Sequence, residues 1–530
     1  MAFDFRVFGS GQLDEQFVDW LVAERALDMA LHYEKLWSYY HNEMREIAPV
    51  GMNTRVSESA RPYRQTQEYG LPSRITGMNY RFYGGILGGT EVRGIERKEV
   101  VIENDIAWRI DTMVDFLFGK DIAIESRATD RQRAQEIQQI LQAVFSANGG
   151  ATYFQQLALL GSIFGFVDVI LRWGGMQGLA HSSDEPKGSE GVGGEDEVPG
   201  GSFAGVRPKH FDEVLRRARN LMLEAIEAPR SLPILDANDY RKLEFYVQHY
   251  WQQHNQLATD SREVVTANRF GRQSGRQKET HNVEILGPRV WQRYEDRELV
   301  AQGVNPLGVV PVVHIQNMPL PLRYEGQGDV EPLIPLQDEL NTRLSDRASR
   351  ITFQSFKMFL GKGIEGFEDR AVAPGRMWST ENPEAAIEEF GGDPGSPSED
   401  THINHIREAL DKASGMASIA AGILKGRIGN LTSAVALKMT LMGVLSKTER
   451  KRKSYRQGIA EVSRLILLAL DRLGIYPNEP EEREIEIHWP SPLPENLMEK
   501  LQEAQLKKEL GVPQEQILKE LGYSEIRGEK

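Results

Sequence analysis

The sequence predicts a mixed α+β fold with more than one folding unit. The chain has 530 residues, which is more than a single hydrophobic core usually supports. Over residues 1–320, helix-type and strand-type patterns follow one another irregularly, without the strand–helix–strand alternation of a parallel sheet. The rest of the chain is mainly long helical patterns around one short glycine-rich segment. We therefore expect an α+β body followed by a largely helical region.

The composition is typical of a folded soluble protein and excludes several kinds of site. Hydrophobic residues make up 40% of the chain and charged residues 26%. The sequence contains no cysteine, which excludes disulfides, thiolate metal sites and cysteine nucleophiles. A reducing environment, or indifference to redox conditions, fits this composition best.

No segment is expected to target or cross a membrane. The opening residues lack a basic stretch followed by an apolar run, so we expect no secretory signal. The segment nearest to a membrane span is 154–173, which contains Gln155, Asp168 and several glycines. These residues favour a buried helix and strand over a membrane span.

Helical periodicity opens the predicted body. Leucine and aromatic residues recur near every 3.6 positions over 15–46, and apolar residues share one face of 103–117. We expect Gly119 to end the second helix in the left-handed conformation. The elements expected next are a strand at 121–126, helices at 130–145 and 152–163, and a strand at 166–173.

Residues 174–207 differ in composition from the segments around them. They are dense in Gly, Ser, Glu and Asp and have almost no apolar residue to bury. We interpret them as a flexible surface insertion, with a dedicated docking segment as the alternative. After this segment, the patterns predict a helix at 211–228 and strands at 243–250, 283–286, 290–294 and 309–315.

The C-terminal part is predicted to be mainly helical. Asp329 is a residue type that caps helices, and an apolar stripe with spacings of three and four follows it. Pro332 and Pro335 crowd the first turn, so the regular helix is expected to begin a few residues later. The stripe consists of Leu333, Leu336, Leu340, Leu344, Ala348 and Ile351. The elements expected next are a glycine-rich β segment at 358–395, a helix at 400–421, a glycine loop at 422–430, a long helix at 432–473, a strand at 484–489 and short helices at 495–510 and 514–521.

The sequence lacks the common motifs of enzymes. Both Gly-Lys pairs, which begin at positions 119 and 361, lack the upstream glycine and the following Ser or Thr of a phosphate-binding P-loop. H-E-x-x-H and G-x-S-x-G do not occur either. His402 and His405 lie one turn apart without a convincing third metal ligand, so we interpret them as an exposed polar face. His249 and His254 lie beside aromatic residues and are interpreted as core or surface residues. We therefore expect no enzymatic activity, catalytic residue, metal or cofactor.

A basic run stands out on the predicted long helix. Its functional interpretation is a patch that contacts phosphate or directs nuclear import. The favoured interpretation is a solvated helix middle that pairs with the excess carboxylates of the chain. The net charge of −14 also argues against a free-standing DNA-binding protein. The run consists of Lys447, Arg450, Lys451, Arg452, Lys453 and Arg456.

Four stretches, taken in order, resemble the portal or head-to-tail connector proteins of tailed bacteriophages. Residues 110–124 are similar to an early segment in which a helix leads into Phe-Gly-Lys and a strand. Residues 305–317 and 330–350 are similar to the strand before the first stem helix and to that helix. Residues 421–456 are similar to the tunnel loop and the long helix after it. No single stretch is as specific as a metal-ligand spacing, but their combined order is fairly specific.

The resemblance implies a division of the chain into named parts. It implies an α/β wing, a helical stem, a small β-containing clip, a long wing helix and a short helical crown. The implied boundaries are wing 1–327 with the insertion 174–207, first stem helix 328–357, clip 358–395, second stem helix 396–422, tunnel loop 423–431, long helix and wing return 432–490, and crown 491–530.

The resemblance also implies a function and a set of partners. Twelve chains would form a ring at one capsid vertex of the virion, assembled in the host cytoplasm and without contact to a membrane. Its channel would pass double-stranded DNA during packaging and ejection. The partners would be the large terminase subunit, head-completion and adaptor proteins, and the major capsid and scaffolding proteins.

Two sets of site residues follow from these implied parts. The tunnel-loop residues Lys425, Arg427 and Asn430 are hypothesised to face the DNA, with the two cations near phosphates. Pairing of these cations with carboxylates of a neighbouring subunit is the alternative. The stem-helix residues expected to pack within and between subunits are Leu333, Leu336, Leu340 and Leu344.

Three other functions are weighed against this one. Another phage head structural protein would usually lack the order of stem helix, β clip, second helix, glycine loop and long helix. An enzyme with an unrecognised α+β catalytic domain would need a convergent polar site, which the sequence does not reveal. A nucleic-acid-binding regulator built on the basic run would be expected to have a basic charge balance and a recognition motif.

Overall fold

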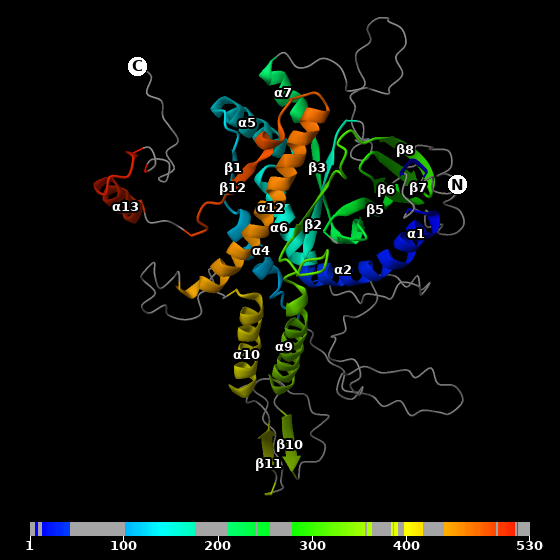
Figure 1. Cartoon of the computed structure of the whole chain (residues 1–530). Helices are drawn as coiled ribbons and strands as arrows, with labels where there is room; N and C mark the ends of the chain where they lie inside the picture. Colours follow the sequence, from blue (N-terminus) through cyan, green and yellow to red (C-terminus); the bar gives the residue numbers. More distant parts are fainter. Residues whose placement is uncertain are drawn as a thin grey trace, which may run out of the picture.

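Two helices and a small strand pair project from a broad body that contains most of the secondary structure (Figure 1). Helices mixed with antiparallel strands confirm the predicted α+β class. Among the residues described here, no helix has the length and apolar character needed to cross a membrane. This computed structural model describes residues 6–8, 13–42, 101–174, 210–239, 241–254, 278–355, 358–362, 383–384, 386–390, 397–416, 439–493, 497–514 and 517.

The first helical segment runs along one side of the body. It consists of α1 (Glu15–Trp20), a π-helical turn η2 (Leu21–Arg25) and α2 (Ala26–His41). Asp14 caps the segment, because its carboxylate accepts a hydrogen bond from the Phe17 backbone at 2.6 Å. Asn42 ends it in the left-handed conformation with φ of 57°. The predicted helix at 15–46 is therefore confirmed up to His41, and residues 43–46 lie outside the described part.

The largest core lies between four helices and a three-stranded sheet. The middle strand β2 (Phe166–Arg172) is buried along its whole length, as its apolar run predicts. It pairs with β3 (Met222–Ile226) on one side and β9 (Val312–Gln316) on the other. The helices are α4 (Ala107–Phe118), α5 (Arg131–Ala147), α6 (Ala151–Phe164) and α12 (Met442–Arg472).

Close approach between these helices and their neighbours depends on two glycines. A side chain at Gly458 of α12 would lie 2.5 Å from Ile315 of β9. A side chain at Gly161 of α6 would overlap the Tyr455 hydroxyl of α12. Because neither position has room for a Cβ atom, glycine sets the spacing between α12 and the rest of the core.

A second core lies under a five-stranded antiparallel sheet. Residues of α1 and η2, among them Val18 and Leu21, pack there against Val247, Ile285 and Tyr294. This arrangement fixes the N-terminal helices to the body. In order across the sheet, the strands are β4 (Ser231–Leu235), β5 (Leu243–His254), β6 (Lys278–Leu286), β7 (Val290–Glu295) and β8 (Glu298–Val304).

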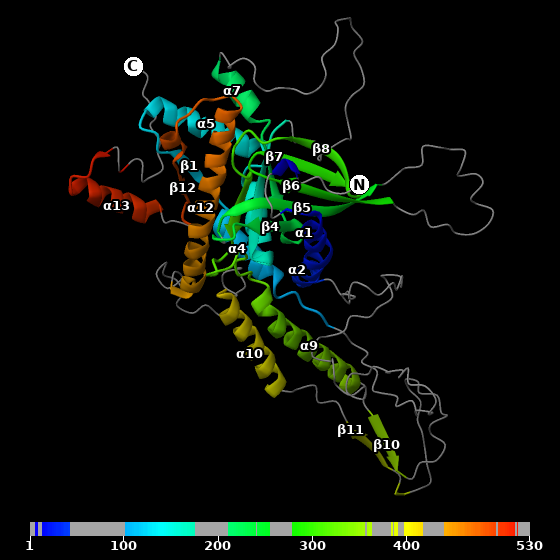
Figure 2. The same cartoon turned by 45° about the vertical axis from the view of Figure 1, so that its right-hand side comes forward.

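The elements outside these cores are short or project from the body. The strands β1 (Ala123–Ser126) and β12 (Ile485–His488) pair with each other although they lie far apart in the sequence. The helix α13 (Leu497–Glu509) lies apart from the body in both views (Figures 1 and 2).

The projecting part consists of two helices and a strand pair. The helices are α9 (Ile334–Ser355), preceded by the turn η5 (Glu331–Leu333), and α10 (Pro397–Ser414), and they lie side by side. Beyond them, β10 (Met358–Lys362) pairs antiparallel with β11 (Ala386–Phe390) (Figure 2). Strand pairing thus occurs inside the segment predicted to be β-like.

Two predictions in the first half of the body are wrong. Gly119 has a right-handed φ of −71° and continues the helical hydrogen bonding to Asp115. It is needed because a Cβ atom would overlap the Asp115 carbonyl. The predicted helix at 211–228 ends early, since α7 covers only Phe211–Ala218. Residues 222–226 are good helix formers, but they form β3 because pairing with β2 overrides local preference.

Two predicted helices of the second half also differ from the structure. The helix at 400–421 ends at Ser414, because Gly415 takes a left-handed φ of 70° and the Met416 N–H bonds to the Asp411 carbonyl. The long helix predicted at 432–473 is interrupted by a turn at Leu441: residues 439–440 are helical, α12 runs from Met442 to Arg472, and residues 432–438 lie outside the described part. The insertion 174–207 after Gly174, the loop 422–430 and most of the helix 514–521 lie outside the described residues.

Candidate functional site

The projecting helices α9 and α10 are called the stem from here on. Polar side chains spaced one turn apart fix α9 to the body. Ser345, Asn341 and Gln337 accept hydrogen bonds from the backbone N–H groups of Val101, Glu103 and Asp105, at 3.0, 3.1 and 3.1 Å. Four helical residues advance about 6.0 Å, and two extended residues advance about 6.6 Å. The similar steps keep the two rows in register. All three side chains are buried, so they tie α9 to the segment 101–105.

Ion pairs link the two stem helices along their exposed sides. Arg347 of α9 pairs with Asp400 of α10 at 2.9 Å, and Arg350 pairs with Glu399. His402 lies 3.5 Å from Glu339 and is half exposed, which confirms its interpretation as part of a polar face. No group of three potential metal-ligating side chains occurs within the described ranges.

Charged side chains also meet in the interior, where the stem joins the body. The Asp329 carboxylate is buried and pairs with Lys447 at 2.8 Å and with Lys451. Lys451 also donates to the Ser162 hydroxyl at 2.9 Å. Lys447 donates to the Ser414 carbonyl at 2.6 Å, at the last residue of α10. We call Asp329, Lys447 and Lys451 the stem joint, because they connect the starts of α9 and α12 with the end of α10.

The two lysines decide the charge state of the stem joint. Burial alone would raise the pKa of the Asp329 carboxyl, but the two ammonium groups hold that pKa well below its usual value. Burial lowers the pKa of Lys451 to about 8, although Asp329 opposes this shift. Asp329 is therefore an anion at neutral pH, paired with two cations away from water.

The stem joint corrects two predictions. Asp329 does not cap the following helix, because its side chain is directed to the lysines and Val330 occupies the capping position. The basic run is not a uniformly solvated helix middle, since Lys447, Lys451 and Arg452 are buried. Their pairing with carboxylates is confirmed, with Arg452 bound to Glu449 at 3.0 Å. The exposed members of the run are Arg450, Lys453 and Arg456.

Comparison with known proteins identifies the family. The family model described as "Phage portal protein, SPP1 Gp6-like" matches residues 106–524. The chain belongs to this portal protein family. The portal protein is thus a structural component of the virion portal vertex and not an enzyme. No curated protein matches it.

Two solved structures show distant similarity to this portal protein. One is described as "Virion of native gene transfer agent (GTA) particle", with a TM-score of 0.37 and 11% identity, covering 78% of this chain and 89% of the other. The second is described as "Neck of empty GTA particle computed with C6 symmetry", with a TM-score of 0.42 and 12% identity, covering 79% and 90%.

The predicted stem-helix leucines lie against the portal protein's own core. Leu333 and Leu340 are fully buried, and Leu336 and Leu344 pack against the same core while partly exposed. Ile403, Ile406 and Leu410 of α10 belong to this core as well. Much of the stripe is therefore covered within one chain. The predicted DNA-facing residues, Lys425, Arg427 and Asn430, lie outside the described residues.

A second buried polar cluster was not predicted. Asp168 of β2 is fully buried and accepts hydrogen bonds from Ser231, Tyr246 and Tyr324 at 2.6, 3.0 and 2.9 Å. His314 directs one ring nitrogen at Asp168 and the other at the Tyr324 carbonyl, both at 2.7 Å. The His314 ring therefore bridges the Asp168 carboxyl group and the backbone of Tyr324. An aspartate inside an apolar strand was the sequence signal for this cluster, which ties the sheet to the segment before the stem.

Proposed function

We propose that twelve copies of this portal protein form a ring whose channel passes double-stranded DNA into and out of the capsid. The observation that carries this proposal is the pair α9 and α10, which project side by side from the body and end in a strand pair (Figure 1). A projection of this kind can line a channel when copies are arranged around an axis. Family membership supports the same function.

In this ring, the parts keep the boundaries expected from the sequence. Residues 1–327 and 432–490 form the wing, 328–357 and 396–422 the stem helices, 358–395 the clip and 491–530 the crown. The clip docks the large terminase subunit during packaging and the neck adaptors afterwards. The wing meets the major capsid and scaffolding proteins. The net charge of −14 per chain makes the ring strongly acidic, so DNA slides instead of binding tightly.

Electron microscopy with mass determination on the purified protein tests this proposal. We expect rings with a central hole and a mass of 12 × 59.9 kDa, about 719 kDa. Rings of eleven or thirteen chains would support the channel and contradict only the count. A protein that stays a monomer or dimer even with scaffolding protein present would contradict the proposal.

The tunnel-loop residues provide a second test. Replacement of Lys425 and Arg427 by glutamine, with and without Asn430→Ala, is expected to change DNA retention or packaging while ring mass stays the same. Loss of rings would instead indicate that these cations pair with carboxylates of the neighbouring subunit.

A further inference from the structure

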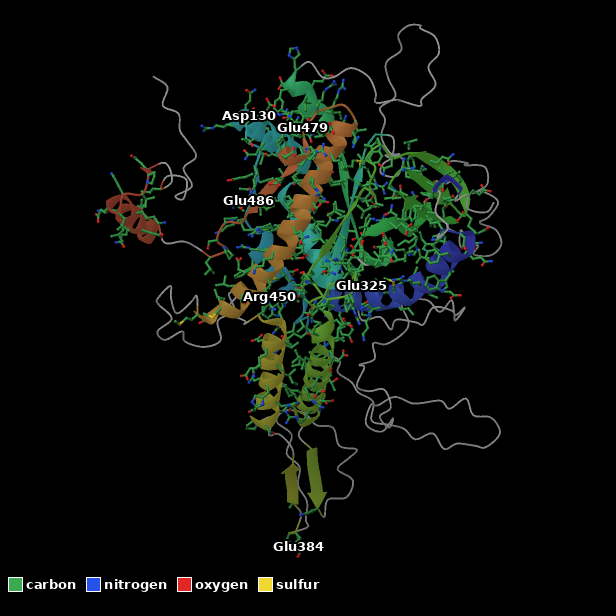
Figure 3. The ribbon with its side chains drawn as sticks, viewed as in Figure 1. Asp130, Glu325, Glu384, Arg450, Glu479 and Glu486 are labelled. Carbon is green, nitrogen blue, oxygen red and sulfur yellow. The ribbon has the colours of Figure 1, made fainter. Side chains whose placement is uncertain are left out.

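Three cations on the outer face of α12 have no ion-pair partner among the described residues. Arg450, Lys453 and Arg456 are all exposed, and the ion pairs formed by other residues of α12 do not include them. Arg456 lies over the ring of Trp489 at 5.5 Å from its centroid. We call these three residues the outer basic stripe. Figure 3 shows Arg450 toward the lower end of α12, near the start of the stem.

The rest of α12 behaves differently. Arg452 pairs with Glu449 at 3.0 Å and Arg464 pairs with Glu461 at 2.5 Å, each three residues away. No carboxylate occurs between Arg450 and Ala460, although the whole chain has 77 acidic residues. In an acidic protein, a gap of this kind leaves positive charge that the helix itself does not compensate. Glu486 of β12 compensates part of it, since the pKa of its carboxyl is lowered mainly by Arg127 and to a smaller extent by Arg456.

The geometry of the stripe fits a polyanion. Arg456 follows Arg450 by six positions in the helix, which places their Cα atoms about 9 Å apart along the axis. Double-stranded DNA carries one charge about every 1.7 Å of its axis, so a surface of this length can face several phosphates. The Trp489 ring restrains the Arg456 guanidinium, which lowers the entropy lost when that group binds.

We propose that the outer basic stripe is a contact surface for the phosphate backbone of double-stranded DNA. This inference rests on the proposed function, because the ring repeats the stripe once per subunit around the DNA. The buried lysines of the same run take no part, since Lys447 and Lys451 neutralise Asp329. This contact depends on the charge of the DNA backbone and not on the base sequence.

The test measures duplex binding to assembled full-length rings as a function of salt. In the variant R450Q/K453Q/R456Q, we expect weaker binding and a shallower salt dependence. Each phosphate contact contributes about 0.9 to the slope of log affinity against log salt. Between about 50 and about 200 mM salt, the affinity of the variant should therefore fall by a factor about 40 times smaller than that of the unaltered protein. The charge-preserving variant R450K/K453R/R456K should keep the original slope.

A matched control changes the same net charge elsewhere. Arg216, Arg219 and Arg472 are exposed and form no ion pair with described residues. The variant R216Q/R219Q/R472Q should therefore bind duplex with nearly the original salt slope. Equal slopes in the stripe variant and this control would overturn the inference.

Ring mass separates the remaining outcomes. If the stripe variant falls apart into smaller species, the stripe meets carboxylates of a neighbouring subunit and the inference is wrong. If the unaltered protein forms no rings even with scaffolding protein present, the proposed function itself fails. If unaltered rings form and bind duplex but the stripe variant binds identically, only the DNA contact fails.

Discussion

The body and the stem are held together by different physical means. In the body, β2 is buried along its whole length, and most side chains that cover it are apolar. In the stem helix α9, buried positions such as Gln337, Asn341 and Ser345 are polar and bond to another backbone segment. Apolar burial is non-directional, whereas hydrogen bonds fix direction and register. The comparison teaches that the body supplies stability and the stem supplies a defined orientation.

The stem joint lies at the border between these two regimes. Asp329 is the last polar anchor before α9 begins, and its lysine partners come from the helix that packs against β9. A buried anion with two cations depends strongly on every partner being present. We therefore expect the largest effects at the joint and the smallest on the stem surface.

Replacement of Asp329 by alanine is expected to be the most damaging single change. It would leave two buried lysines without their anion, which costs about 3–5 kcal/mol of unfolding free energy. Urea unfolding followed by tryptophan fluorescence, at fixed protein concentration, measures this loss. Asp346→Asn is the matched control, because Asp346 is a partly exposed stem carboxylate and should change stability by less than about 0.5 kcal/mol. Equal effects of the two replacements would contradict the role of the joint.

The second prediction concerns pH. Because burial lowers the pKa of Lys451 to about 8, the unfolded chain binds more protons than the folded chain between pH 8 and about 10.4. The contribution of Lys451 to the free energy of unfolding should therefore rise with pH across that window. In Lys451→Met this rise, about 2–3 kcal/mol by pH 10, should disappear from urea unfolding curves.

The matched control for the pH prediction is Lys453→Met, which removes an exposed lysine from the same helix. It should keep the pH dependence of the unaltered protein. A rise that persists in Lys451→Met would show that Lys451 is not the group responsible.

The third prediction tests packing in the body. In Gly458→Ala, the new methyl group would lie 2.5 Å from the Ile315 side chain, so this buried side chain or the elements around it must shift. We expect a loss of about 1–3 kcal/mol despite the better helix propensity of alanine. Gly443→Ala on the same helix is the control, since its nearest contact would be 3.4 Å away. In the double variant Gly458→Ala/Ile315→Ala, the total loss should be smaller than the sum of the two single losses, and simple additivity would argue against a direct clash.

Local periodicity predicted much of the body but little of the stem joint. The helices α5 and α6 and the strand β2 were predicted within a few residues, because their apolar patterns coincide with their buried faces. Asp329 was expected to be a cap, since capping is a local rule, whereas its partner Lys451 is 122 positions away. Partners at that distance cannot be read from spacing alone.

The sequence contained a signal that separates the buried cations of the basic run from the exposed ones. Val444, Lys447, Lys451 and Tyr455 recur at spacings of three and four, which places the two lysines on the apolar face of α12. Arg450 and Lys453 fall on the other side. Sequence periodicity could therefore have separated buried from exposed cations, although it could not have identified Asp329 as their partner.

The smallest expected effect distinguishes the interior of the stem from its surface. Asn341→Ala removes the acceptor of the Glu103 N–H, and an unsatisfied buried donor costs about 1–2 kcal/mol. Hydrogen exchange should show faster opening at 101–105 with little change at β2, because the lost bond belongs to the contact between stem and body and not to the core. Arg347→Gln removes only a partly exposed ion pair with Asp400, so it should change stability by less than about 0.5 kcal/mol. If Arg347→Gln were the more damaging of the two, surface charge and not the buried polar row would set the orientation of the stem.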